Sequence, residues 1–205
     1  MPREDPQGKA LSDAISARVH EQLRKTLGGP QLPQGTVTIL FTDVEGSTDL
    51  VRELGDHGAR AILRRHDEVV QTAITKHEGT EVERAGDSFM AAFITARQAV
   101  ACAMDIQQAL AAGRKKEAEA PIQVRIGMDT GEIIAEENRY FGSTVFRAAR
   151  IADLAPAGRI LISEATKVLA SQAGFEFEDL GEHELKGLGP GHRLYEVTTG
   201  PEGAG

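Results

Sequence analysis

Two aspartates, each in a turn that contains glycine, are the residues of this chain best suited to chemistry. Asp43 follows the apolar run at 39–41, and Asp87 ends the Ala-Gly-Asp turn at 85–87. Each follows a run of strand-forming residues, so the two carboxylates converge at one sheet end if the strands are neighbours. Paired carboxylate oxygens at such a point are what Mg²⁺ or Mn²⁺ needs when it bridges a triphosphate.

The turn after Asp43 gives this pairing a phosphate-binding context. Gly46, Ser47 and Thr48 stand where a strand changes into a helix, and N–H groups at a helix N-terminus favour phosphate oxygens. Taken alone, Asp43 could equally be a helix cap, and Asp87 could be an ordinary turn residue. The pair, each member with its own strand, favours a metal site.

The elements that must position these residues alternate between apolar strands and amphipathic helices. In the first half we expect a strand at 36–42, a helix at 48–77 that breaks near 56–58, a hairpin of strands 80–84 and 88–93, and a helix at 95–112. In the second half we expect a strand at 122–128 with a hairpin partner at 133–134 after Gly131, a helix at 142–154, a strand at 160–162, a helix at 163–174, and strands at 175–180 and 193–197. This mixture predicts an α+β sandwich in which helices cover a mostly antiparallel sheet.

The length of 205 residues predicts one medium domain with extensions at both ends. We expect a tail and helix over 1–33, the folded domain over 34–198, and a flexible tail over 199–205. Apolar residues recur every four positions over 11–27, which predicts a helix before the first strand. That helix could pack on the domain, pair with its copy in a dimer, or relay a signal.

Composition excludes several classes of function. The net charge of −8 argues against binding to nucleic acid or to an anionic membrane surface. No apolar run is long enough for a membrane span and no signal-like segment begins the chain, so we expect a cytoplasmic location. The lone Cys102 is expected to be a buried small hydrophobe. The six histidines lack the spacing of a metal site.

Five segments together resemble the catalytic domain of class III nucleotidyl cyclases. They are the first metal motif at 41–48, the second at 86–93, the R-I-G-x-H-x-G-E strand at 125–132 with Asp129 at the His position, the G-x-x-V-N-x-A-A-R helix at 140–151, and the closing strands at 185–188 and 194–197. They occur in family order over residues 36–197, which is more specific than any one motif. The resemblance implies a ferredoxin-like, palm-like fold.

The resemblance also implies a reaction and an assembly. The ribose 3′-oxygen of a nucleoside triphosphate attacks the α-phosphate, giving a 3′,5′-cyclic nucleotide and pyrophosphate, so the enzyme is a phosphorus–oxygen lyase. Two Mg²⁺ or Mn²⁺ ions per site are implied, held by Asp43, Asp87 and the backbone carbonyl of Val44. Implied phosphate-binding residues are Glu45, Gly46, Ser47 and Thr48, through their N–H groups, and Lys186, with Arg193 behind it. The site is shared between two chains of a homodimer.

Two positions that would read the base depart from the adenylyl cyclase pattern. Glu83 stands where adenylyl cyclases have Lys, and a carboxylate suits the N1–H and 2-amino donors of guanine, as in guanylyl cyclases. Glu83 could instead pair with Arg84 or face solvent. Arg139 suits guanine O6 and N7, or could pair with Glu83 across the dimer. The expected substrate is therefore GTP or ATP, and a pyrimidine nucleoside triphosphate is less favoured.

A third departure concerns the rate. Phe146 stands where the family has the Asn that orients the ribose, whereas Arg150, which would stabilise charge on the α-phosphate, is present. Loss of one positioning contact typically costs about a hundredfold in rate, so we expect slow turnover. The alternative is a pseudo-cyclase, a dimeric nucleotide-binding or regulatory module without chemistry.

Overall fold

The computed structural model describes residues 33–114, 122–136 and 139–199. The predicted helix at 11–27 and residues 200–205 of the predicted tail lie outside the described residues. Within the described ranges, no helix combines the length and the apolar character that a membrane span requires.

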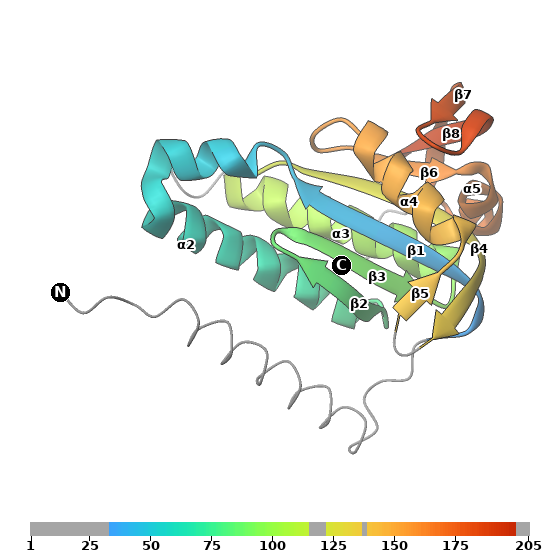
Figure 1. Cartoon of the computed structure of the whole chain (residues 1–205), viewed down its shortest axis with the longest axis horizontal. Helices are drawn as coiled ribbons and strands as arrows, with labels where there is room; N and C mark the ends of the chain where they lie inside the picture. The colour runs from blue at the N-terminus through green and yellow to red at the C-terminus, as the bar shows by residue number, and fades with distance from the viewer. Residues whose placement is uncertain (1–32, 115–121, 137–138, 200–205) are drawn as a thin grey trace, which may run out of the picture. The chain divides into compact units, whose positions relative to one another are not determined.

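The centre of the fold is an eight-stranded sheet (Figure 1). Its strands are β1 (Gly35–Val44), β2 (Thr80–Ala85), β3 (Ser88–Phe93), β4 (Val124–Glu136), β5 (Arg139–Phe141), β6 (Ile160–Ser163), β7 (Glu176–Leu185) and β8 (Gly189–Thr199). The strand order is β2-β3-β1-β4-β6-β8-β7, and β5 pairs with β4 outside this path. The pairing of β4 with β6 is parallel, and the other pairs are antiparallel.

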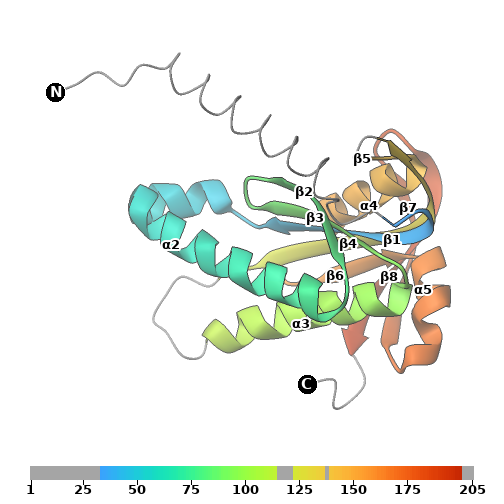
Figure 2. The same ribbon diagram turned by 90° about the horizontal axis from the view of Figure 1, so that it is seen from below.

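Helices cover both faces of the sheet (Figure 2). They are α2 (Ser47–Lys76), α3 (Ala96–Arg114), α4 (Ser143–Leu154) and α5 (Glu164–Ala170), which a 3₁₀ turn at Ser171–Ala173 follows. Residues of α2 and α3 pack with Leu40 and Phe89 in the larger apolar core. Ala148 of α4 packs with Val37 and Ile39 in a second core on the other face. This arrangement confirms the predicted α+β fold.

Antiparallel pairing brings the two predicted metal turns together. Thr42 of β1 lies opposite Phe89 of β3, so β1 ends beside the turn between β2 and β3. On its other side β1 pairs with β4, where Asp43 lies opposite Arg125. Asp43 therefore lies between the β2–β3 turn on one side and Arg125 of β4 on the other.

The predicted hairpin at Gly131 is wrong. β4 runs unbroken through Gly131, which lies opposite Val37 of β1, and the partner that folds back on β4 is β5. A Cβ atom at Gly131 would stand 2.6 Å from Oγ1 of Thr144 in α4. This glycine thus permits the close approach of a helix rather than a turn of the chain.

The helix after Asp43 has a kink. Gly55 adopts φ 68°, a left-handed conformation that interrupts α2 just before the predicted break at 56–58. Val51 and Leu54 are apolar, yet they are 41% and 43% exposed. The segment of α2 before Gly55 therefore contributes little to the core, while the segment after it packs on the sheet.

Candidate active site

Asp43 is fixed at the end of β1 by neighbours on both sides. Its Oδ1 accepts a hydrogen bond from the Ser88 hydroxyl at 2.6 Å, and its Oδ2 accepts one from Nε of Arg125 at 2.9 Å. Because Ser88 follows Asp87 directly, the first bond ties the end of β1 to the β2–β3 turn. The two aspartates therefore meet at one end of the sheet, which is the convergence that the sequence predicts.

Asp87 presents a carboxylate with unused capacity. The turn that carries it contains Gly86 at φ 64°. Oδ2 of Asp87 is buried and has no hydrogen-bond partner among the described residues, and a buried carboxylate oxygen without a partner is unfavourable. A cation or a hydrogen-bond donor beside Oδ2 would remove that cost, and the carboxylate as a whole can still serve as a metal ligand.

Side chains alone would not complete a metal site here. No group of three or more His, Cys, Asp or Glu that could hold a metal occurs in the described ranges. Mg²⁺ in phosphoryl-transfer enzymes usually takes one or two carboxylates and obtains its remaining oxygens from water and substrate phosphates. Asp43 and Asp87 fit that donor set, to which the Val44 carbonyl at the end of β1 was expected to contribute.

Arg125 is a site residue that the sequence reasoning missed. Its guanidinium contacts Asp43 through Nε and Nη2 and lies 4.0 Å from the Glu45 carboxylate. The hydrogen bonds to Asp43 raise the pKa of Arg125, so its charge is permanent. The residue stood inside the 125–132 motif, but only the pairing of β4 with β1 reveals that it faces Asp43.

The turn before α2 supports part of the predicted phosphate site. Gly46 adopts φ 68° and begins the helix, so the N–H groups of Ser47 and Thr48 belong to a first turn without intrahelical acceptors. The prediction for Glu45 needs correction, because its N–H donates to the Gln123 carbonyl at 2.9 Å. The helix N-terminus, rather than the residue before Gly46, is the part that could receive phosphate oxygens.

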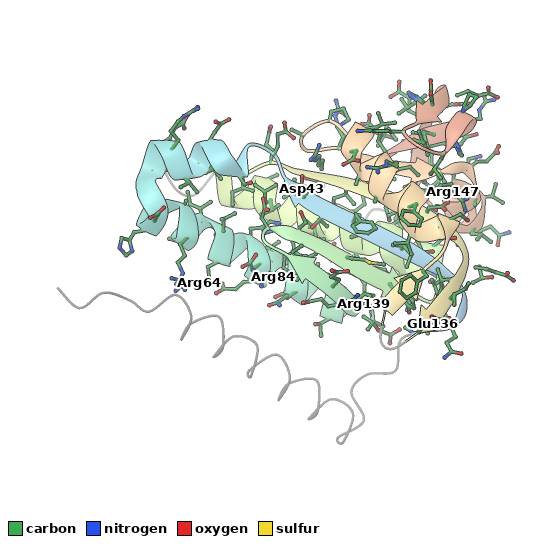
Figure 3. All side chains as sticks on the ribbon, viewed as in Figure 1. Asp43, Arg64, Arg84, Glu136, Arg139 and Arg147 are labelled. Carbon is green, nitrogen blue, oxygen red and sulfur yellow. The ribbon has the colours of Figure 1, made fainter. Side chains whose placement is uncertain are left out.

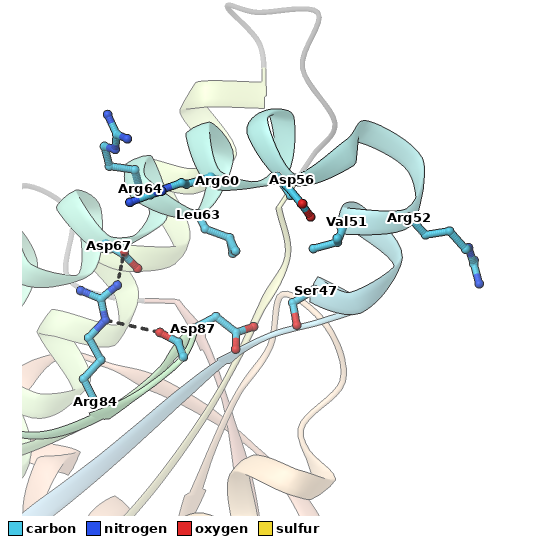
Figure 4. A pocket seen from close by; sticks show the side chains of 12 residues that line it. Ser47, Val51, Arg52, Asp56, Arg60, Leu63, Arg64, Asp67, Arg84 and Asp87 are labelled. Atoms are coloured by element: carbon cyan, nitrogen blue, oxygen red, sulfur yellow. Dashed lines mark hydrogen bonds and ion pairs between the residues drawn. The ribbon is translucent and has the colours of Figure 1, made fainter. Parts of the chain in front are cut away.

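A cavity of about 830 Å³ opens beside this turn, between α2 and the β2–β3 turn (Figure 4). It is lined by Ser47, Val51, Arg52, Asp56, Ala59, Arg60, Leu63, Arg64, Asp67, Arg84, Gly86 and Asp87. The volume lies within the range of small-molecule sites. Ser47 and Asp87 lie beside each other along one edge of the cavity, so a ligand there could touch both the helix N-terminus and the candidate metal carboxylate.

The remaining predicted catalytic residues form a second group, on α4 and the β7–β8 turn. Arg150 donates to Asp153 at 2.9 Å and to the Lys186 carbonyl at 3.2 Å. Phe146 is 61% exposed. Among the described residues, no hydrogen bond or ion pair connects this group to Asp43 or Asp87.

Of the two candidate phosphate-binding cations near the end of the chain, Lys186 is the better placed. Lys186 is exposed in the β7–β8 turn beside Arg150. Arg193 donates to both carboxylate oxygens of Asp179, at 2.6 to 3.1 Å. Because a bidentate carboxylate occupies Arg193, we retain Lys186.

The two predicted base-reading residues are exposed on short strands. Glu83 lies on β2 and Arg139 on β5 (Figure 3 labels Arg139). Arg84 forms its ion pair with Asp67, so the local pairing of Glu83 with Arg84 is not formed. In the ranges that the structure describes, Glu83 and Arg139 have no polar partner, and both remain available to a ligand or a second chain.

Asp129, at the position where the resemblance has His, serves the packing of α4. It is 1% exposed and accepts a hydrogen bond from Nε of Arg147 at 2.7 Å (Figure 3 labels Arg147). Close to this ion pair, a Cβ atom at Gly127 would stand 2.0 Å from the backbone nitrogen of Ala152. A buried ion pair and a glycine contact thus hold α4, and with it Arg150, tightly against β4.

Comparison with known proteins identifies the family. A family model described as the adenylate and guanylate cyclase catalytic domain matches residues 30–198. The chain belongs to this family. An uncharacterised protein of Mycobacterium tuberculosis is 43% identical over 161 residues, which is 76% of this chain and 53% of that protein. The cyclase domain thus spans about half the length of the curated relatives it matches first.

Solved cyclase structures share the fold. A structure of adenylate cyclases from Trypanosoma brucei in their monomeric state is 26% identical with a TM-score of 0.71, covering 85% of this chain and 94% of that one. An adenylate/guanylate cyclase/hydrolase from Silicibacter pomeroyi is 29% identical with a TM-score of 0.68, covering 82% and 99%. The cyclase domain of this chain therefore retains nearly the whole length of these domains.

Proposed function

We propose that this chain is a nucleotidyl cyclase that converts a nucleoside triphosphate to a 3′,5′-cyclic nucleotide and pyrophosphate. The observation that carries the proposal is the meeting of Asp43 and Asp87 at one sheet end, beside the N-terminus of α2. Residues 34–198 are the catalytic unit. The ribose 3′-oxygen forms a bond to the α-phosphorus, and the bond from that phosphorus to the pyrophosphate oxygen breaks.

Each residue of the first group has a defined task in this proposal. Asp43 and Asp87 hold divalent ions, which when bound lower the pKa of the ribose hydroxyl and neutralise the phosphates. The N–H groups of Ser47 and Thr48 bind phosphate oxygens. Arg125 holds the Asp43 carboxylate in place before substrate arrives and then has a permanent charge to offer to the triphosphate.

The second group supplies the rest of the site from another copy of the chain. Arg150 stabilises the charge that develops on the α-phosphate, and Lys186 binds the terminal phosphates. In the family resemblance the two groups of one site come from different chains, and we infer on that basis that a complete site requires a homodimer. The exposed side chains of Phe141 and Phe146, at 47% and 61%, suit a surface that a second copy covers.

Guanine suits the exposed base-reading pair best. Glu83 accepts hydrogen bonds from N1–H and the 2-amino group, and Arg139 donates to O6 and N7. We therefore propose GTP as the preferred substrate, with slow turnover because Phe146 cannot hydrogen-bond the ribose.

One observation favours a second candidate, a pseudo-cyclase that binds nucleotide without cyclising it. Phe146, which is 61% exposed on α4, stands where the family has a hydrogen-bonding side chain. That replacement would weaken chemistry more than binding.

Product analysis separates the two candidates. The full chain is incubated with Mn²⁺ and each of the four ribonucleoside triphosphates, and cyclic nucleotide and pyrophosphate are quantified by chromatography. The cyclase proposal expects equimolar amounts of both products, highest with GTP. Triphosphate binding without any cyclic product would establish the pseudo-cyclase instead.

A further inference from the structure

A buried histidine lies behind Asp87 and has no role in the site described so far. His66 of α2 is 0% exposed, and its ring meets Phe89 edge-on with the centroids 5.8 Å apart. Its Nδ1 lies 3.2 Å from Oδ1 of Asp67. Since a carboxylate only accepts hydrogen bonds, Nδ1 carries the proton of that contact. The ring is therefore fixed in both position and tautomer.

This assignment leaves Nε2 as an acceptor. Nε2 of His66 is buried without a hydrogen-bond partner among the described residues, as is Oδ2 of Asp87. Burial lowers the pKa of His66, so the ring is neutral. The ring contacts Phe89, which follows Asp87 by two residues, so His66 packs on the same β2–β3 turn. Each of these two buried acceptors needs a donor, and a water molecule has two O–H groups to give.

The same network also holds the backbone of the turn. The second carboxylate oxygen of Asp67 pairs with Arg84, whose Nε donates to the Gly86 carbonyl at 3.4 Å. The Arg84 guanidinium lies 4.8 Å from the centre of the Phe89 ring. Figure 4 shows Asp67, Arg84 and Asp87 at the wall of the cavity. Asp67 thus connects an arginine that fixes the peptide before Asp87 with a histidine that packs on Phe89.

We propose that His66 is a positioning residue for Asp87, acting through a water molecule that donates to Nε2 of His66 and to Oδ2 of Asp87. A carboxylate has about four lone pairs that can accept contacts. The water would use one of them and orient the Asp87 carboxylate, and the others would remain available to a divalent ion. Partners of this kind behind a metal ligand typically change metal affinity about 10- to 100-fold when removed. The inference rests on the proposed function, because it assigns Asp87 as a metal ligand.

The test uses two substitutions that keep different atoms of the ring. His66→Gln retains a polar atom near the place of Nε2, whereas His66→Asn retains one near Nδ1 and loses the group directed at Asp87. Mn²⁺ affinity of the full chain is measured by electron paramagnetic resonance with the metal alone. We expect His66→Asn to weaken binding about tenfold and His66→Gln to stay within about threefold of the wild type.

Controls distinguish this inference from the proposed function. His77→Asn removes another His–Asp contact of the α2 region, 2.7 Å from Asp105, and should leave Mn²⁺ affinity unchanged. Asp87→Asn should abolish site-specific Mn²⁺ binding. If it does not, the proposed metal site is wrong. If it does, but the two His66 variants behave alike, His66 only fills the core and the inference is overturned.

A second measurement covers the case in which His66→Asn does not fold, as judged by its thermal unfolding midpoint. A high-resolution crystal structure of the wild-type chain should show one ordered water within hydrogen-bonding distance of both Nε2 of His66 and Oδ2 of Asp87. A direct contact between these atoms, or a side chain between them, would overturn the proposal.

Discussion

The metal-binding residues and the residues that would meet the ribose and the base differ in how firmly the chain holds them. Asp43 has hydrogen bonds from Ser88 and Arg125 and is only 27% exposed, whereas Phe146 is 61% exposed. Glu83 and Arg139 have no polar partner within the described ranges. One chain thus preorganises the metal-binding group, while the group that would meet the ribose and base needs a ligand or a second chain to complete it.

The largest effect should come from the firmly held group. Asp87→Asn removes a charge that a metal requires while preserving shape, so we expect kcat/KM for cyclisation to fall about a thousandfold. Rates are measured with Mn²⁺ and GTP, and the matched carboxylate-to-amide control is Glu196→Gln, whose native partner is Arg159. Similar losses in both variants would show that Asp87 has no special role.

Complementation would show whether the two groups act from different chains. Asp87→Asn and Arg150→Ala chains should each be inactive, but equal mixing gives half heterodimers, each with one intact site. We therefore expect about a quarter of wild-type activity after mixing. Mixing Asp87→Asn with Asp43→Asn, which damages the same group, is the control and should restore nothing. Equal recovery in both mixtures would contradict the division.

A gain of activity is expected at the exposed position on α4. Phe146→Asn supplies a hydrogen-bonding group where the family has one, so kcat should rise about tenfold with little change in KM. Phe141→Asn removes another exposed aromatic ring and serves as the control. If Phe141→Asn gives the same gain, reduced surface hydrophobicity would explain the effect better than ribose positioning does.

The smallest effect concerns choice of base. Glu83→Lys replaces an acceptor with a donor, and Arg139→Asp replaces a donor with an acceptor, so the ratio of kcat/KM for ATP over GTP should rise about tenfold in the double variant. The single variants are measured beside the double variant, because two residues that read one base should couple. An unchanged ratio would refute the base-reading assignment for both.

The same contrast explains how much the sequence could predict. The turns at Asp43 and Asp87 depend on local signals, namely apolar runs and glycines, and both strands were predicted almost as they occur. The contact of Arg125 with Asp43 depends instead on which residue of β4 lies opposite Asp43 in the sheet. Strand register is a property of the assembled sheet, so no local pattern around Arg125 reveals it.

Glycine and polar side chains account for the main errors. Gly131 was interpreted as a turn residue because glycine usually marks turns within strand patterns, but it provides space for Thr144. The β7–β8 hairpin is longer than expected, because backbone pairing continues beyond the predicted strand end at residue 180. The pairs of Glu182 with Arg193 and of His183 with His192 are polar, so no apolar pattern marks this part of the hairpin. The spacing of the histidines gave His66 no role in a metal site, and only its burial and its contact with Asp67 suggest a function.

The position of Glu83 on β2 has a consequence for how freely such a domain could change its substrate. β2 and β7 are the two outer strands of the sheet, and exposed outer strands invite pairing with other chains unless charged residues discourage it. β2 carries three charged residues, Glu81, Glu83 and Arg84. Since either sign of charge protects the strand from aggregation, selection could exchange acidic for basic residues at position 83 without loss of solubility.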